Sequence, residues 1–434
     1  MTRRQRNDFE ILAEELERRF AEGVHAPWTD DAFDSLALEA FEYQFSANAT
    51  YRAFCERRGV TPAAAEGWRD VPAVPATAFK HLDLVSVDGP ASDGARAVGA
   101  VAKVWAAPSG AGDVDVPTRA VDSAAAIFRT SGTTARTSGT TARTSGTTAR
   151  TSGTTARTGG TTAGLPLRGR HVVPRLSLYR ASLLPPFKEH LLPEVDTIPF
   201  VSLVPPPHEL NDSSLSYMVG AAAERFASET HWVVSGTGEL DEVRLRRALE
   251  RLSDTGQPCL LVGTVLALWH LLGRLEASPA PPLPAGSRVM QTGGFKGSGR
   301  AVSRAELHRK VSALLGVPAD RVVSEYGMTE LLSQLYTPVL REGARAAAEH
   351  VAPPWLRVRA LDPVTLDELA PGTEGLLAFF DLANLGSVCH VLTEDVGSVR
   401  EASSVVLSGR ARGAEPRGCS RAMDELMAAA GAGG

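Results

Sequence analysis

A hydroxyl- and glycine-rich heptapeptide is repeated five times between residues 129 and 163, with copies beginning at Arg129, Arg136, Arg143, Arg150 and Arg157. The unit is Arg-Thr-Ser-Gly-Thr-Thr-Ala, and the last copy has Gly in place of Ser. One unit is suited to wrapping nucleotide phosphates, because glycine allows close backbone approach while hydroxyl and amide groups donate to phosphate oxygens. Stacked copies would have no apolar core of their own. We therefore interpret the array as one functional loop lengthened by duplication.

The first copy has the best anchor for phosphate binding, because it follows a predicted strand that ends at Phe128. A strand fixes the direction of the amide groups that come directly after it. We expect phosphate to be bound by the hydroxyl and amide groups of Ser131, Gly132, Thr133 and Thr134. The surplus copies cost only on the order of 1 kcal/mol in loop-closure entropy, so the fold should tolerate them.

A second glycine-rich segment follows the predicted strand 287–290. There Gly293 and Gly294 would let the backbone approach a flat ligand, with Lys296 close behind them. An ordinary glycine turn with a surface lysine is the competing interpretation.

The segment 326–330 follows another predicted strand, 321–324, and combines four useful groups. Tyr326 can stack on a base, Gly327 is flexible, and Thr329 can donate to a phosphate. Glu330 offers the hard carboxylate oxygens that Mg²⁺ prefers. The alternative for Glu330 is a helix-dipole partner at the start of a helix.

Asp395 lies in the segment Thr-Glu-Asp-Val-Gly, after the apolar pair at 391–392. At the end of a strand, one carboxylate can accept hydrogen bonds from both ribose hydroxyls. A turn-forming aspartate before glycine is the alternative.

The elements that must position these residues alternate between strand and helix from about residue 215 to residue 328. This order predicts an α/β sheet with helices on both faces. A helix over 176–192 should kink or break at Pro185 and Pro186. We expect a helical region, an α/β core containing the repeat, a β-rich subdomain and a short tail, over 1–70, 71–350, 351–408 and 409–434.

Composition narrows the class of protein. The formal net charge of −5 argues against nucleic-acid binding by bulk electrostatics. No apolar run approaches the length of a membrane span, and the N-terminus predicts a charged amphipathic helix rather than a signal peptide. Four widely spaced cysteines form no zinc pattern. We expect a reduced, cytoplasmic protein.

In combination and in this order, the motifs resemble those of the adenylate-forming superfamily. More narrowly, the chain resembles the acyl-protein synthetase family, the fatty-acid-activating component of the bacterial luciferase fatty acid reductase system. The likeness spans 40–422 and includes the segments at 43–44, 51–55, 71–75, 79–80, 213–216 and 333–334. It implies an α/β fold with a large domain of mixed sheets flanked by helices, a small β-rich subdomain and a truncated C-terminal region.

The resemblance also implies a two-step reaction that uses ATP and Mg²⁺. A fatty or other apolar carboxylic acid becomes acyl-AMP, and a thiol then takes the acyl group. Cys419 matches the acceptor cysteine of the luciferase-linked members, which pass the acyl chain to a reductase; an acyl-carrier protein is another partner to consider. Four nearby arginines would favour its thiolate: Arg410, Arg412, Arg417 and Arg421. Cys55, Cys259 and Cys389 have the apolar or helical contexts of core residues.

Two departures from the superfamily matter. The chain ends soon after Arg410, and no lysine follows Lys310. The charge that offsets the reacting phosphate must then come from Mg²⁺, loop amides, Lys296 or Arg410, whose position resembles a hinge-region arginine. We expect the acyl pocket to be lined from 258–270, with Leu260, Val262, Leu266 and Trp269.

Two other functions remain open. One is an acyl- or aryl-CoA ligase resembling phenylacetate–CoA ligase. The other is a non-catalytic relative that only binds nucleotide.

Overall fold

A computed structural model describes residues 3–86, 125–130, 168–293, 303–401, 403–411 and 416–431. Several predicted features lie outside these residues. They are the strand expected at 101–105, all of the repeat after Thr130, Arg412, and the site residues Ser131, Gly132, Thr133, Thr134, Gly294 and Lys296.

Parallel strands form one half of a large mixed sheet. In spatial order they are β8 (Val322–Tyr326), β7 (Arg288–Thr292), β6 (Leu260–Thr264), β4 (Ile198–Ser202) and β5 (Ala227–Trp232). Each neighbouring pair is parallel. Buried apolar residues fill β4, β6 and β7, as expected for strands covered on both faces.

Antiparallel strands form the other half and continue the same sheet from β8. In spatial order they are β9 (Leu335–Tyr336), β10 (Glu349–Val351), β14 (Ser404–Arg410), β13 (His390–Glu401), β12 (Glu374–Asp381) and β11 (Leu356–Leu361). The short β1 (Val74–Pro75) pairs parallel to β13. The fold class predicted from the sequence, mixed α/β with a large sheet flanked by helices, is confirmed. The proposed division into domains remains a prediction. Strands of the expected core and of the expected β-rich subdomain belong to this one sheet.

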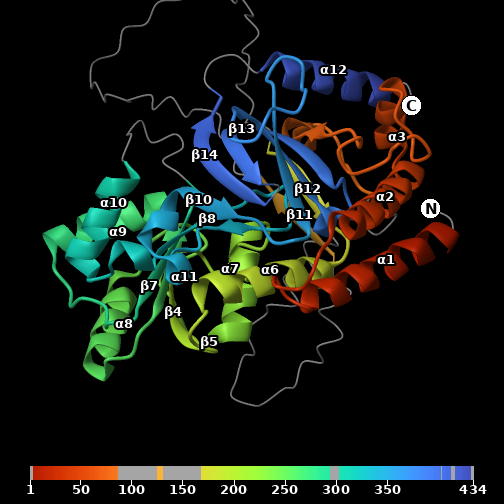
Figure 1. Cartoon of the computed structure of the whole chain (residues 1–434). Helices are drawn as coiled ribbons and strands as arrows, with labels where there is room; N and C mark the ends of the chain where they lie inside the picture. Colours follow the sequence, from red (N-terminus) through yellow and green to blue (C-terminus); the bar gives the residue numbers. More distant parts are fainter. Residues whose placement is uncertain are drawn as a thin grey trace, which may run out of the picture.

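Helices cover both faces of the sheet (Figure 1). Those around the parallel half are α6 (Leu176–Leu191), α7 (Ser214–Phe226), α8 (Glu242–Thr255), α9 (Val265–Ala277) and α10 (Arg304–Leu315). Most begin at a hydroxyl or carboxylate cap; the Thr264 hydroxyl, for example, accepts from the Ala267 amide at 3.1 Å. Gly256 ends α8 and Gly316 ends α10 in the left-handed conformation, which glycine adopts without strain.

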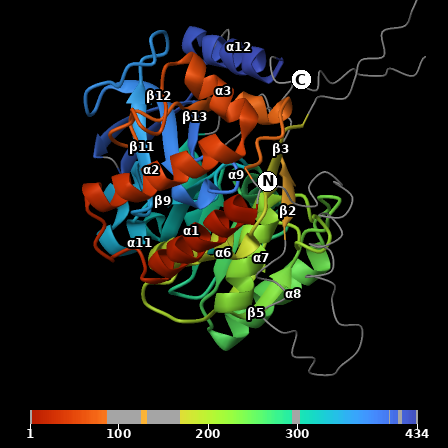
Figure 2. The same cartoon turned by 90° about the vertical axis from the view of Figure 1, so that its right-hand side faces the viewer.

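The N-terminal helices pack beside the antiparallel half (Figure 2). They are α1 (Arg3–Ala21), α2 (Asp30–Ala47) and α3 (Ala49–Arg57), so the predicted helical region is present. The C-terminal α12 (Arg417–Gly431) lies against α3. Shorter elements are η1 (Ala76–Lys80), η3 (Ala319–Arg321), α11 (Val339–Glu342), η4 (Ala344–Ala348) and η5 (Leu382–Asn384), with a separate hairpin of β2 (Ala126–Arg129) and β3 (Arg170–Val173). No helix in the described ranges is long and apolar enough to cross a membrane.

We expected a kink or a break at Pro185 and Pro186, and the structure shows no break there. Both prolines lie inside α6, which continues to Leu191. Each proline lacks an N–H and so removes one hydrogen bond to the preceding turn. The helix persists because residues on both sides of the pair are buried, including Leu183 and Phe187. Tertiary packing therefore outweighs the local preference.

Candidate active site

A cavity of about 420 Å³ lies at the carboxyl ends of the parallel strands, where ligands bind in open α/β sheets. Its lining includes Thr264 at the end of β6, Thr292 at the end of β7, Gly293 directly after it, and residues 327–330 after β8. Gly293 has φ +70, a conformation that favours glycine. Five predicted site residues line this cavity, and they come from three separate motifs: Gly293, Gly327, Thr329, Glu330 and Arg410.

Tyr326 and Asp395 are joined to this lining by hydrogen bonds through Arg410. The Tyr326 hydroxyl donates to Asp395 Oδ2 at 2.8 Å, and Arg410 Nε donates to Asp395 Oδ1 at 3.0 Å. The Tyr326 ring is stacked on Phe379, with ring centroids 5.5 Å apart. Burial, reinforced by the Asp395 charge, raises the pKa of Tyr326 well above its usual value, so its hydroxyl remains a donor.

Asp395 is neither at a strand end nor in a turn, so both locations expected for it are wrong, while its role towards ribose stays a prediction. It lies within the twelve-residue β13, directly opposite Arg410 of β14. A bulge follows between Val396 and Gly397, where a side chain at 397 would meet the Val406 carbonyl. The cross-strand register, rather than the end of a strand, brings the carboxylate to the guanidinium group.

Glu330 lies in a turn between β8 and β9, so its interpretation as a residue at a helix start is wrong. Two buried side chains hold this turn. His171 of β3 donates from Nδ1 to the Thr329 carbonyl at 2.7 Å, and Asn384 donates to the Glu330 carbonyl at 2.8 Å. Residues from distant elements therefore position Thr329 and Glu330 at the cavity.

Protonation of His171 should weaken the fold in acid, because burial lowers its pKa from 6.5 to about 4. Below pH 6.5 the unfolded chain binds the proton more readily, so the stability that neutral His171 contributes is lost as the pH falls from 6.5 towards 4. Between pH 7 and pH 5 we expect wild type to lose about 2 kcal/mol more unfolding free energy than His171→Asn, which cannot titrate. Denaturant titrations at both pH values measure this difference; equal losses would contradict it.

Asp381 at the end of β12 holds the next part of the same turn. Its carboxylate accepts from the amides of Leu332 and Ser333, both at 2.9 Å, from the Ser333 hydroxyl at 2.7 Å, and from the Ala383 amide at 3.0 Å. Burial raises its pKa to about 6, although these four donors oppose the shift. The sequence contains no local signal for this role, which depends on contacts between distant segments.

Replacing Asp381 with alanine should lower the free energy of unfolding by about 3–5 kcal/mol, because several buried donors would lose their acceptor. The measurement is equilibrium denaturation at neutral pH. Asp196→Ala is the matched control, because the Asp196 side chain is 99% exposed and pairs only with Lys188 at the end of α6. A loss below about 1 kcal/mol for Asp381→Ala would show that the turn does not depend on it.

Four further lining residues received no role in the sequence analysis: Lys80, Thr130, Glu325 and Gln334. Lys80 ends η1, and within the described residues no carboxylate lies at ion-pair distance from its ammonium group. Thr130 directly precedes the first Ser-Gly-Thr-Thr segment, so the first copy of the repeat contributes a residue to the cavity lining. Glu325 accepts a hydrogen bond from the Thr292 hydroxyl, and the side chain of Gln334 is buried.

Cys419, the predicted acyl acceptor, lies on a helix. It faces the core from the first turn of α12 and is 2% exposed, packed among Ala73, Leu361 and Leu392. Its sulfur lies 3.9 Å from the carbonyl of Thr393, a residue that lines the cavity. The thiol therefore contacts β13, a strand that also lines the cavity. The three cysteines predicted as core residues, Cys55, Cys259 and Cys389, are also buried.

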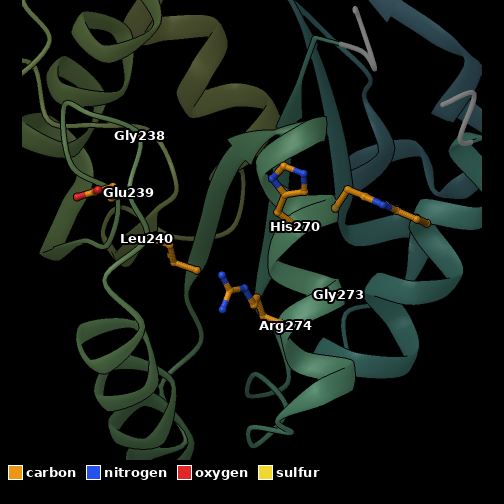
Figure 3. Close-up of a pocket in the computed structure, with 7 residues that line it drawn as sticks. Gly238, Glu239, Leu240, His270, Gly273 and Arg274 are labelled. Carbon is orange, nitrogen blue, oxygen red and sulfur yellow. The ribbon is translucent and has the colours of Figure 1, made fainter. Parts of the chain in front are cut away.

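A larger groove, of about 910 Å³, lies on the surface beside α9 and contains none of the motif residues (Figure 3). Trp269 lines this groove and not the motif-lined cavity. Of the four residues expected to line an acyl pocket, only Leu266 does so, while Leu260 and Val262 are buried within the sheet. We therefore assign the candidate site to the smaller cavity, because the motif residues line it.

Solved structures with the same fold identify the class of protein. The chain aligns with a 2-hydroxyisobutyryl-CoA ligase in complex with 2-HIB-AMP and CoA, at 14% identity and a TM-score of 0.56 over 88% of this chain and 68% of that one. The same ligase in its postadenylation state gives 13% identity and a TM-score of 0.54, over 88% and 67% of the two chains. The protein therefore has the fold of the adenylate-forming ligases.

The family follows from the sequence match. The family model described as acyl-protein synthetase, LuxE, matches residues 189–428, which is more than half of the chain. The protein belongs to this acyl-protein synthetase family.

Two curated relatives match over shorter segments. The long-chain-fatty-acid–luciferin-component ligase of Vibrio harveyi is 34% identical over 88 residues, 19% of this chain and 23% of that protein. Its counterpart in Aliivibrio fischeri is 43% identical over 53 residues, 12% and 14% of the two chains. The chain thus aligns with less than a quarter of the length of either relative.

Proposed function

We propose that this protein is an enzyme, an acid–thiol ligase that activates a fatty or other acyl carboxylate with ATP as acyl-AMP and transfers the acyl group to a thiol. The observation that carries the proposal is the linked set Tyr326, Asp395 and Arg410 at the edge of a cavity that also contains Thr329 and Glu330. These groups derive from separate motifs and converge only in the folded chain. The family membership and the ligase names of the curated relatives support the proposal.

Each group has a part that its contacts allow. The Asp395 carboxylate is held by two donors and retains lone pairs for the ribose hydroxyls. The hydroxyl groups of Thr329 and Thr130 line the cavity where phosphate oxygens would lie. The acid binds farther in, so that its carboxylate oxygen can attack the α-phosphorus and release pyrophosphate.

Magnesium fits this arrangement through the nucleotide rather than through a protein cage. The described residues contain no cluster of three or more histidine, cysteine or acidic side chains able to hold a metal. Mg²⁺ in ATP sites is commonly held by one or two carboxylates together with phosphate oxygens, and Glu330 supplies such a carboxylate at the cavity wall. When bound, the ion would offset phosphate charge.

Lys80 could supply the positive charge beside the reacting phosphate that was expected from Lys296 or Arg410. Its ammonium group comes from η1, on the side of the cavity that also carries Thr130. Charge developing on the reacting phosphate would be stabilised by such a fixed cation. We propose that Lys80 contacts the phosphates and assists adenylation.

Lys80→Ala should lower the rate of acid-dependent AMP formation by about tenfold to a hundredfold, while Lys80→Arg retains more activity. Lys310→Ala is the control, because Lys310 pairs with Glu276 on the surface between α10 and α9. AMP release measured by chromatography gives the rates. Equal rates for Lys80→Ala and Lys310→Ala would exclude Lys80 from the reaction.

The thiol acceptor we propose is Cys419, whose sulfur lies near a residue that lines the cavity. Because α12 buries this side chain against the strands of the sheet, acyl transfer requires the helix to move away from them. That burial also favours the second candidate function, transfer to an external thiol such as CoA or a carrier protein. In either case the acyl group could pass onward to an acyl reductase.

Trapping with hydroxylamine tests the shared first step without depending on the acceptor. Incubation of the full chain with ATP, Mg²⁺, acid and hydroxylamine should give equal amounts of AMP and hydroxamate. ADP in place of AMP would exclude an acyl adenylate.

A further inference from the structure

Two polar residues that line the cavity, Glu325 and Gln334, have no part in the proposed binding of the nucleotide. Glu325 and Tyr326 are consecutive in β8, so their side chains point to opposite faces of the sheet. Tyr326 is directed to Asp395, whereas Glu325 accepts a hydrogen bond from the Thr292 hydroxyl of β7. Thr292 and Glu325 are partners in the parallel register. Both side chains line the cavity.

The Glu325 carboxylate is a buried part of the cavity wall. It is 5% exposed, and burial raises its pKa to about 7, with the Thr292 hydrogen bond opposing the shift. A side chain at position 327 would place its Cβ 2.5 Å from Glu325 Oε1 and 3.3 Å from Gln334 Cγ. Gly327 therefore leaves the room that these two polar side chains occupy.

Gln334 adds a second buried acceptor. It is 3% exposed, and its Oε1 atom has no hydrogen-bond partner among the described residues. A side-chain hydrogen bond joins Gln334 to the Tyr179 hydroxyl, which fixes the amide against α6. Buried acceptors of this kind are stabilised when a ligand supplies the missing donor.

The lining of the cavity also includes apolar side chains. Three of them are Leu215 and Met218 of α7 and Leu266 of α9. A hydrocarbon segment can pack against these side chains, but an unsubstituted alkyl chain would leave the Gln334 oxygen without a donor and would further desolvate Glu325.

We propose that the acid activated by this protein carries a hydrogen-bond donor, a hydroxyl or amino group, which Glu325 and Gln334 recognise while its hydrocarbon part packs against Leu215, Met218 and Leu266. The inference rests on the proposed function, since it places the acyl chain beside Glu325 and Gln334. Glu325 and Gln334 are specificity residues in this account. An ammonium group would pair with ionised Glu325, whereas a hydroxyl group can donate to either acceptor.

The test compares matched acids on the full chain with ATP and Mg²⁺. Each chain length is supplied unsubstituted, with a hydroxyl group and with an amino group at successive positions. ATP–pyrophosphate exchange gives kcat/KM, and calorimetry with each acid gives its affinity independently of turnover. The variants are Glu325→Gln and Gln334→Met, which nearly preserve shape, and Glu374→Gln on the exposed start of β12 is the control.

For wild type and Glu374→Gln we expect a preference of about tenfold to a hundredfold for a donor-bearing acid over its unsubstituted match. Glu325→Gln should abolish a preference for an amino group, and Gln334→Met should reduce a preference for a hydroxyl group. Equal use of unsubstituted acids, or an unchanged preference in both variants, overturns the inference while leaving the proposed function intact.

Failure of the proposed function gives a different result. Suppose that no acid supports exchange but donor-bearing acids still bind preferentially, and that the variants abolish this preference. This result would support recognition by Glu325 and Gln334 and would refute the ligase activity. Absence of both exchange and preferential binding would refute both.

Discussion

Replacing Asp395 with alanine is expected to lower acid-dependent AMP formation by about a hundredfold or more and to raise KM for ATP more than KM for the acid. The carboxylate holds Arg410 and the Tyr326 hydroxyl and, in our proposal, the ribose as well. Each charge-assisted hydrogen bond contributes about 1.5–3 kcal/mol, so losing two or more reaches this size. Steady-state kinetics with each substrate varied in turn provides the measurement.

Three companion variants locate the effect. Tyr326→Phe removes one donor to Asp395 and should cost about tenfold. Asp395→Asn keeps the shape and should be intermediate. Asp320→Ala, at an exposed position on η3, should behave as wild type. If Asp395→Ala were to retain the wild-type KM for ATP, the nucleotide would have to bind elsewhere.

Cys419→Ser is expected to abolish an acyl-enzyme thioester while leaving adenylation within about threefold of wild type. Serine cannot form a thioester, and Cys419 contacts β13 without lining the cavity where adenylation would occur. Incubation with ATP, Mg²⁺ and isotopically labelled acid, followed by a denaturing gel and treatment with neutral hydroxylamine, detects the thioester. The expected loss is complete for this variant.

Cys55→Ser is the matched control, because Cys55 is a buried cysteine on α3, the helix against which α12 packs. Burial raises the pKa of the Cys55 thiol to about 12, which makes it a poor nucleophile. Persistent labelling of Cys419→Ser would show another acceptor residue. Unlabelled wild-type protein that still produces acyl-CoA would favour the CoA ligase.

The parallel half of the fold could be predicted from sequence because its strands are short apolar runs between amphipathic helices. The segments 260–262 and 288–290 show this pattern, and the structure places β6 and β7 there. The prolines of α6 do not break the helix, and local sequence could not show this, because it does not report the burial of Leu183 and Phe187 around them.

The site was predicted in part. Gly293, Gly327, Thr329, Glu330 and Arg410 were named from their motifs, and the structure gathers them at one cavity. The pairing of Asp395 with Arg410 depends on the register of β13 and β14, and neither local motif contains it. Lys80 and Glu325 were missed as site residues because their importance depends on which distant elements lie opposite them.

Cys419 shows the limit of reasoning from charge along the chain. Arg410 is paired with Asp395, and Arg421 donates to the Thr365 carbonyl, so at least two of the four neighbouring arginines are engaged elsewhere. The amphipathic pattern of α12, which buries Cys419 with Ala422 and Leu426, was the stronger signal. Acylation of this cysteine therefore depends on movement of the helix as well as on its chemistry.

ATP–pyrophosphate exchange by the wild-type chain tests the central claim most directly, because it requires reversible adenylate formation and no acceptor thiol. With Mg²⁺ and a panel of carboxylic acids, we predict that labelled pyrophosphate enters ATP only when a suitable acid is present, and that Asp395→Ala suppresses this incorporation. Absence of exchange with every acid tested, in a folded protein, would contradict the assignment of this site as an acyl-adenylating centre.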